Sequence, residues 1–278
     1  MINYNNEFTS LHLAIYSNNL ELVKNLILDP KIDINSFDKN GCTSLYLACL
    51  FNNLEIVKVL VSNSKININI CNINYYNYTA LHVVCINNFL DIAKILISDS
   101  RIDLNKINIY GFTALHLACS FNNLEIIKIL MLNPNININM INNEHLTPFY
   151  LACLNNHLEI VNILISDLRV DINKFDNFGW TPFHFICYFK RKKIFNIFNE
   201  KNRYIDLEKK TTNNFKNIPA GFNIFDLNFK LNNIEFSNSI NKYKGNIILK
   251  KNINYYCADG NIDKLKKILK NNNKFKIY

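Results

Sequence analysis

The chain has 278 residues, of which 49% are hydrophobic and 19% charged, and its formal net charge is +9. This composition supports a folded core and is not that of a disordered chain. The residues before Thr9 lack the charged start and apolar run of a secretory signal, and no apolar stretch reaches the length of about 18 residues that suggests a membrane span, so we expect a soluble intracellular protein.

Six segments of the chain superpose on one another. The first begins TSLHLAIYSNNLEL and the fourth begins TALHLACSFNNLEI. The segments open at spacings of 34, 36, 34, 34 and 34 residues, on Thr9, Thr43, Thr79, Thr113, Thr147 and Thr181. No single segment of this kind can bury its apolar face alone, so we predict that neighbouring repeats stack into a solenoid.

Each repeat predicts two short helices joined by a turn. The opening threonine is a good N-cap residue, and in the last two repeats Pro148 and Pro182 occupy the first helical turn, where a missing N–H costs nothing. A paired asparagine such as Asn18-Asn19 follows, and asparagine tolerates the left-handed conformation of a tight turn. Apolar residues at helical spacing then predict the second helix, and a segment such as 102–105 predicts an extended arm into the next repeat.

The repeat openings resemble the T-P-L-H-x-A opening of the ankyrin repeat. This resemblance implies an all-α ankyrin-repeat solenoid of helix-turn-helix units with short extended hairpin arms over residues 1–200. The third repeat has a two-residue insertion within Cys71–Tyr78. Residues 201–278 form a basic C-terminal region in which only Asn223–Glu235 and Tyr256–Lys270 can be laid over the repeat, both in degenerate form.

The residue types that usually carry catalysis recur with the repeat and are therefore expected to be structural. Four histidines share the fourth position of the repeat, where the resemblance implies hydrogen bonds at the helix start and to the adjacent repeat: His12, His82, His116 and His184. Five cysteines share another position and are expected to be buried free thiols: Cys49, Cys85, Cys119, Cys153 and Cys187.

We expect no enzyme activity, no cofactor and no metal. The chain has no Cys-x-x-Cys pair that would favour zinc. With six glycines scattered over 278 residues, it also has no glycine-rich loop that would bind phosphate.

The positions that the resemblance assigns to partner binding are rich in aromatic residues. In ankyrin repeats these positions are the hairpin tips before each threonine and the end of the first helix, which together form a concave face. The candidate partner-binding residues are Phe51, Tyr75, Tyr76, Tyr78, Tyr110, Phe112, Phe121, Phe178, Trp180, Tyr188 and Phe189. They favour a monomeric scaffold or adaptor that binds a protein partner in an aromatic groove. A compositional bias toward Phe, Tyr, Ile, Asn and Lys is the alternative explanation.

A basic run follows the sixth repeat's first helix, at Lys190, Arg191, Lys192 and Lys193. It fits a nuclear import signal, and hence a nuclear as well as a cytoplasmic location, the edge of a site for an anionic partner, or a solvated helix start. Residues 1–189 have 11 Lys and Arg against 15 Asp and Glu, a net charge of −4, whereas residues 190–278 have 20 against 7, a net charge of +13. The alternative function is therefore binding of nucleic acid or another anionic ligand through the basic C-terminal region.

Overall fold

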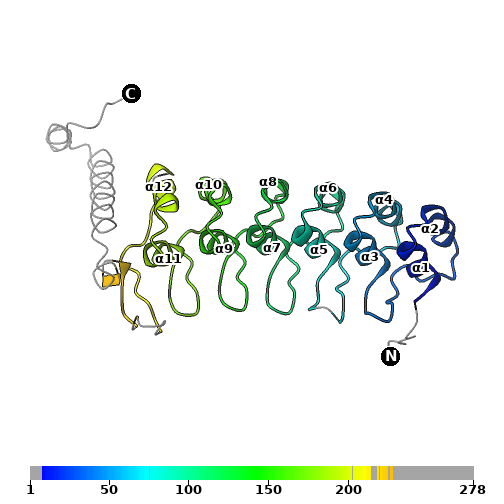
Figure 1. The fold of residues 1–278 in the computed structure, drawn as a ribbon, viewed down its shortest axis with the longest axis horizontal. Helices are drawn as coiled ribbons and strands as arrows, with labels where there is room; N and C mark the ends of the chain where they lie inside the picture. The colour runs from blue at the N-terminus through cyan, green and yellow to red at the C-terminus, as the bar shows by residue number, and fades with distance from the viewer. Residues whose placement is uncertain are drawn as a thin grey trace, which may run out of the picture.

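The structure is a computed structural model that describes residues 8–74, 76–201, 203–213, 218, 220–224 and 226–227. Over these residues it has six helix pairs arranged in two rows, with the hairpin loops all on one side of the stack (Figure 1). The first row consists of α1 (Ser10–Tyr16), α3 (Ser44–Leu50), α5 (Ala80–Asn87), α7 (Ala114–Ser120), α9 (Pro148–Leu154) and α11 (Pro182–Tyr188). The second row consists of α2 (Leu20–Leu26), α4 (Leu54–Ser62), α6 (Leu90–Ser98), α8 (Leu124–Leu132), α10 (Leu158–Ser166) and α12 (Lys192–Lys201). The predicted all-α solenoid of six helix pairs is confirmed.

Every first-row helix begins at the predicted threonine. In each case the threonine side chain accepts a hydrogen bond from the backbone N–H three residues later. In the third repeat the bond is reciprocated, because the backbone N–H of Thr79 donates to Nδ1 of His82 at 3.0 Å. The same reciprocal pair starts α7 and α11. The opening threonine therefore fixes where each first-row helix starts, and in the third, fourth and sixth repeats a histidine three residues later completes the cap.

The turns between paired helices use the left-handed conformation, as the asparagine pairs predicted. The turn residues Asn18, Asn52, Asn88, Asn122 and Asn156 have φ angles of 50°, 56°, 58°, 62° and 61°. In the sixth repeat this position is taken by Lys190, whose φ is 52°. Asparagine adopts this conformation at lower cost than other non-glycine residues, so the turn survives without glycine.

The core runs continuously along the stack between the two helix rows. It contains the five repeated cysteines, all of them buried. Among the six described repeats, the first leaves the side that faces away from the stack open: Leu13 is 53% exposed, whereas Leu47 and Leu117, at the same position of later repeats, are 1% and 5% exposed. Each later repeat therefore depends on the one before it to bury the apolar residue at this position.

A ladder of asparagines joins successive repeats at the extended arms. Each side chain accepts a backbone N–H and donates to a backbone carbonyl of the next repeat, at distances of 2.7–3.1 Å. The ladder residues are Asn35, Asn69, Asn105, Asn139 and Asn173. A single amide thus satisfies both kinds of backbone group across each repeat boundary.

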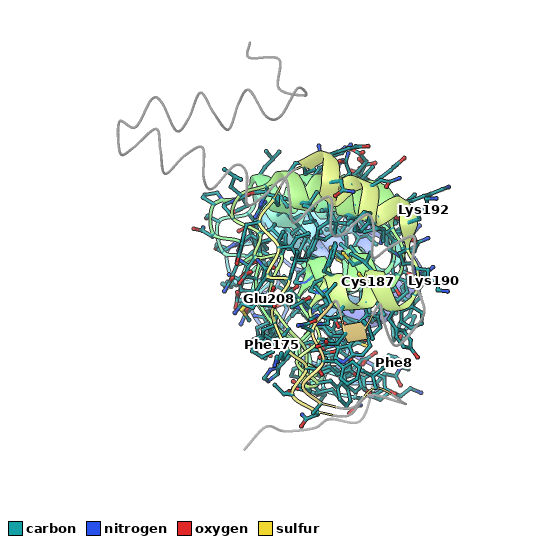
Figure 2. The ribbon with its side chains drawn as sticks, turned by 90° about the vertical axis from the view of Figure 1, so that its left-hand side faces the viewer. Phe8, Phe175, Cys187, Lys190, Lys192 and Glu208 are labelled. Atoms are coloured by element: carbon teal, nitrogen blue, oxygen red, sulfur yellow. The ribbon has the colours of Figure 1, made fainter. Side chains whose placement is uncertain are left out.

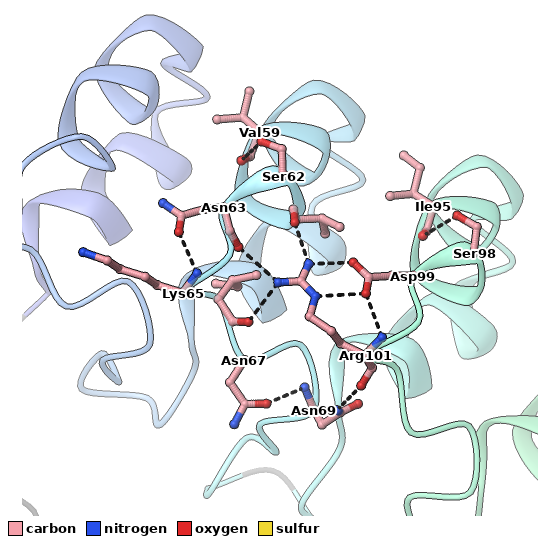
Figure 3. A network of polar contacts seen from close by, with 12 residues as sticks. Val59, Ser62, Asn63, Lys65, Asn67, Asn69, Ile95, Ser98, Asp99 and Arg101 are labelled. Carbon is pink, nitrogen blue, oxygen red and sulfur yellow. Dashed lines mark hydrogen bonds and ion pairs between the residues drawn. The ribbon is translucent and has the colours of Figure 1, made fainter.

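Arginines add a second link between repeats at the ends of the second-row helices (Figure 3). The guanidinium of Arg101 donates to the carbonyls of Val61 and Asn63 at 2.7 and 3.2 Å, and it pairs with Asp99 at 2.6 Å. These carbonyls belong to the last turn of α4, which has no partners for them within the helix. Arg169 and Arg203 donate in the same way to carbonyls at the ends of α8 and α10.

The described residues after α12 continue the stack. The ladder residue Asn173 reaches Tyr204 and Asp206. Ile205, Leu207, Ile218, Ile224 and Leu227 are buried. Reciprocal hydrogen bonds between Asn223 and Asp226, both of 3.0 Å, start a helical turn where the first degenerate segment was laid over the repeat. The segment Tyr256–Lys270 and most of the basic C-terminal region lie outside the described residues.

Candidate functional site

The hairpin tips and the ends of the first-row helices form one surface, which we call the inner face. Tip residue Asn40 and helix-end residues Leu50 and Phe51 line the same pocket, so the two sets of positions face each other. Successive tips are joined by backbone hydrogen bonds, such as the 3.0 Å bond from the N–H of Asn143 to the carbonyl of Tyr110. The inner face is therefore a continuous and braced surface.

An Asp or Asn side chain shapes each tip from beneath. In the fourth repeat, Oδ1 of Asn108 accepts the backbone N–H groups of Tyr110 and Phe112 at 3.0 and 2.9 Å. Gly111 between them has a φ of 78°, and a Cβ there would lie 2.8 Å from the backbone nitrogen of Asn143. Close packing of the fourth tip against the fifth therefore requires glycine at residue 111.

Three aromatic rings gather at the first two repeats, and we call Phe8, Tyr16 and Phe51 the first aromatic cluster. The ring centroids of Phe8 and Tyr16 are 5.0 Å apart, and those of Tyr16 and Phe51 are 5.4 Å apart. Tyr16 is 40% exposed and Phe51 is 45% exposed. The candidate partner-binding residues include Phe51 but not Tyr16, because the first repeat has few large side chains at the partner-binding positions. The feature that could have identified Tyr16 is its position at the end of the first helix of its repeat.

Tyr76, Tyr78 and Tyr110 form the second aromatic cluster. The centroid of Tyr76 lies 6.2 Å from that of Tyr78 and 5.3 Å from that of Tyr110. The two-residue insertion lengthens this tip, which the bond from the N–H of Asn72 to the carbonyl of Tyr78 closes. Tyr76 is 52% exposed and has a left-handed φ of 56°. A bulky residue is uncommon in this conformation, and such strain tends to occur at functional sites.

The other proposed residues have different environments. Phe121 ends α7 and is 54% exposed, while Phe112 is half-buried and packs edge-on against His116 at a centroid distance of 5.7 Å. Tyr75 lies outside the described residues. Only some of the candidate partner-binding residues therefore lie in the first and second aromatic clusters.

Trp180 does not belong to the surface. It has no exposed area and packs against Phe185 and Tyr188 at centroid distances of 5.3 and 5.4 Å. Its position directly before the opening threonine predicted an exposed residue at the hairpin tip, but its ring is buried in the core. Phe178 and Phe189 are 38% and 41% exposed, whereas Tyr188 is half-buried.

The basic run lies at the turn into α12. Lys190 occupies the turn, α12 begins at Lys192, and the guanidinium of Arg191 lies 5.8 Å from the ring centroid of Phe189. Lys190, Lys192 and Lys193 are exposed and Arg191 is half-buried. When the stack is viewed along its long axis, Lys190 and Lys192 lie on one side and Phe175 lies on the opposite side (Figure 2).

Few charges lie on the inner face of the first five repeats. Among the described tips and first-row helices of these repeats, the exposed charged residues are Lys39 and Glu144. The second-row helices instead form exposed ion pairs three residues apart, such as Lys58–Glu55 at 2.6 Å and Lys128–Glu125 at 2.5 Å. The inner face is thus aromatic and nearly uncharged, while the outer row is charged and solvated.

Burial holds the repeated histidines and cysteines in neutral forms. Burial lowers the pKa of His82, His116 and His184 to about 4. The Nε2 atoms of His82 and His116 lie 3.0 Å from the carbonyls of Phe112 and Leu146 in the next repeat. Burial raises the pKa of the Cys49, Cys85, Cys119 and Cys153 thiols, which removes the thiolate that a nucleophile needs. His82 and His116 therefore serve the repeat boundaries, and no cluster of metal-ligating side chains occurs in the part of the chain that the structure describes.

None of the described helices is long and apolar enough to span a bilayer. Among curated proteins, no match was found. Among solved structures, the ankyrin repeat domain of Bcl-3, "a unique member of the IkappaB protein family", superposes with a TM-score of 0.69 at 20% identity, over 79% of this chain and 93% of that chain. EF0377, an ankyrin repeat protein, superposes with a TM-score of 0.62 at 23% identity, over 68% of this chain and 95% of that chain. These likenesses show the fold.

Sequence models of one family match most of the repeats. The model of ankyrin repeats in three copies matches residues 1–72 and 64–142, and the model of ankyrin repeats in many copies matches residues 132–186. Ankyrin repeat domains typically mediate protein–protein interactions and are usually non-catalytic. The matched residues make up about two thirds of the chain, which therefore belongs to the ankyrin repeat family.

Proposed function

We propose that this protein is a non-enzymatic scaffold or adaptor that binds a protein partner on its inner face. The observation that carries the proposal is the exposure of aromatic rings on a nearly uncharged surface: Phe51, Tyr76, Tyr110 and Phe121 are 45%, 52%, 44% and 54% exposed. Exposed apolar patches of this kind generally mark interaction sites. Tyrosine and phenylalanine provide large contact areas at a low cost in conformational entropy.

The second aromatic cluster is the centre of the proposed interface. Its tip is longer than the others, and Tyr76 holds its exposed ring against Tyr110 from a strained backbone conformation. The carbonyl of Tyr76 accepts the N–H of Ile109 at 3.1 Å, so the adjacent tip supports this conformation. A ring held in place before binding loses little freedom when a partner arrives.

The double substitution Tyr76→Ser and Tyr110→Ser tests the proposal. Partner proteins captured from a native cell extract should be lost, while the far-UV circular dichroism spectrum and the thermal midpoint stay unchanged. The matched control is Phe175→Ser, because Phe175 is also exposed, at 41%, but lies on the opposite side of the stack (Figure 2).

Capture that survives the double substitution but is lost with Phe175→Ser would place the interface on the other side of the stack. Salt separates this function from binding through the basic C-terminal region. Binding on the inner face should change little with added salt, whereas binding of nucleic acid weakens steeply because counterions are released.

A further inference from the structure

A pocket of ≈340 Å³ opens on the inner face between the first and second repeats. Tyr16, Leu50 and Phe51 form its exposed walls, and the buried Cys42 and Tyr46 line it from the core side. Ligand pockets in proteins have volumes of about 300–1,000 Å³, so this one is at the small end of the range. It has room for one large side chain and not for a folded element.

The polar groups beside the pocket already have partners. Oδ1 of Asp38 accepts the backbone N–H groups of Asn40 and Cys42 at 2.9 and 2.8 Å, and Oδ2 accepts the hydroxyl of Tyr16 at 3.3 Å. The sulfur of Cys42 lies 2.8 Å from Nδ2 of Asn72, and burial raises the pKa of this thiol to about 12, so it is neutral. The pocket therefore offers apolar contact without a charge waiting to be paired.

The walls of the pocket suit an aromatic ring in particular. Tyr16 and Phe51 already meet at an interplanar angle of 58°, and Phe8 meets Tyr16 edge-on at 86°. Aromatic rings prefer such tilted and edge-to-face contacts at centroid distances of about 4.5–7 Å. A ring inserted between these walls can extend the same pattern, which an aliphatic side chain cannot.

The surroundings of the pocket favour an uncharged partner segment. The amino group of Lys39 lies 4.6 Å from the ring centroid of Phe8, and Asp38 is only 5% exposed. Beyond these two, the next exposed charge on the described inner face is Glu144, three repeats away. An acidic segment laid along this face would find Lys39 as its one nearby opposite charge, and a basic segment would find none beside the pocket, so most of its charges would lose their hydration without gaining a partner.

We propose that the pocket between the first two repeats receives a large aromatic side chain from an uncharged segment of the protein partner. This proposal rests on the proposed function, because it identifies what kind of partner the inner face accepts. The pocket anchors the segment, and the second aromatic cluster contacts it further along the stack.

Short peptides selected from a random phage-displayed library on the full-length chain test the proposal. The selected peptides should share an aromatic residue with uncharged neighbours, and their affinity, measured by fluorescence anisotropy, should not change between low and high salt. Phe51→Ala should weaken their binding by at least about tenfold. Phe175→Ala is the matched control, because Phe175 is 41% exposed, close to the 45% of Phe51, but lies on the opposite side of the stack (Figure 2).

Three results would overturn the anchor assignment. The first is a set of selected peptides that is acidic or basic and binds less tightly as salt is added. The second is an equal effect of Phe51→Ala and Phe175→Ala, and the third is a failure to select any binder. If Phe51→Ala has no effect while Tyr76→Ser with Tyr110→Ser abolishes binding, the pocket proposal fails and the inner-face function stands. If neither variant matters, both fail.

Discussion

At the scale of single residues, the repeat depends on a few positions with special backbone or protonation states. The residue two positions before the opening threonine has a positive φ in five repeats. These residues are Gly41, Asn77, Gly111, His145 and Gly179. The glycines here also leave room for the next tip. The buried histidines are neutral because burial lowers their pKa.

Substituting Gly111 with alanine should destabilise the protein. The φ of 78° is unfavourable for alanine, and the new Cβ would lie 2.8 Å from the backbone of Asn143. We expect a loss of about 2 kcal/mol or more in the free energy of unfolding, measured in urea. His145→Gly at the same position is the matched opposite and should raise stability by about 0.5–1 kcal/mol. If neither substitution changes the free energy of unfolding, the tips tolerate a non-glycine residue in this conformation.

Acid should destabilise the protein well above the range in which carboxylates titrate. A histidine whose folded-state pKa is about 4 resists protonation, whereas the same residue in the unfolded chain titrates near its ordinary value of 6.5. Stability is therefore complete above about pH 6.5 and falls as the pH drops toward 4, by up to about 3 kcal/mol for each histidine. The midpoint of urea unfolding should therefore fall when the pH is lowered from about 7.5 to about 6 and then to about 5. His116→Gln should make the fall shallower, and an unchanged midpoint would contradict neutral burial.

At the scale of elements, helices of seven to ten residues are too short to be stable alone, so their ends and their neighbours stabilise them. Threonine caps start the first row, and the arginine links satisfy the carbonyls at the ends of α4, α8 and α10. The sequence predicted the caps, because a cap and its helix are adjacent in the chain. It did not predict the arginine links, because Arg101 and Val61 are 40 residues apart.

Replacing Arg101 with glutamine should loosen the boundary between the second and third repeats. The change removes the guanidinium donors to Val61 and Asn63 and the side-chain hydrogen bond that keeps the pKa of Asp99 below its ordinary value. Because the pair is partly exposed, we expect a modest cost of about 1 kcal/mol in the free energy of unfolding. Hydrogen exchange should rise at the end of α4 and stay constant at the end of α8, which Arg169 links in the same way and which serves as the internal control.

At the scale of the whole molecule, stability passes from repeat to repeat, and so the same substitution has different effects along the stack. Leu13 and Leu117 occupy one position of the repeat, but the first is 53% exposed and the second 5% exposed. Leu117→Ala should cost about 2–5 kcal/mol through the cavity it leaves, and Leu13→Ala less than about 1 kcal/mol. Urea unfolding of both variants measures the difference, and equal costs would mean that Leu13 is covered in solution.

Much of the fold could be predicted because the repeat occurs six times in the sequence. The threonine caps, the left-handed asparagines and the buried histidines and cysteines follow from local chemistry and from periodicity. The candidate site was less predictable. Trp180 was proposed for the surface but is buried, and Tyr16 was left out but lines the pocket. In both cases contacts with other side chains decided the position of the ring.

The sequence by itself determined the repeat, its length and the identity of the residues that cap, turn and fill it, because these depend on neighbours within one period. Only the tertiary structure decided which aromatic rings meet, since Tyr16 reaches Phe51 and Tyr76 reaches Tyr110 across repeat boundaries. It also decided that the inner face is nearly uncharged, because stacking directs the charged second-row helices away from the tips. The reason is geometric: periodicity assigns a residue to a position, but packing between repeats sets how far its side chain reaches solvent.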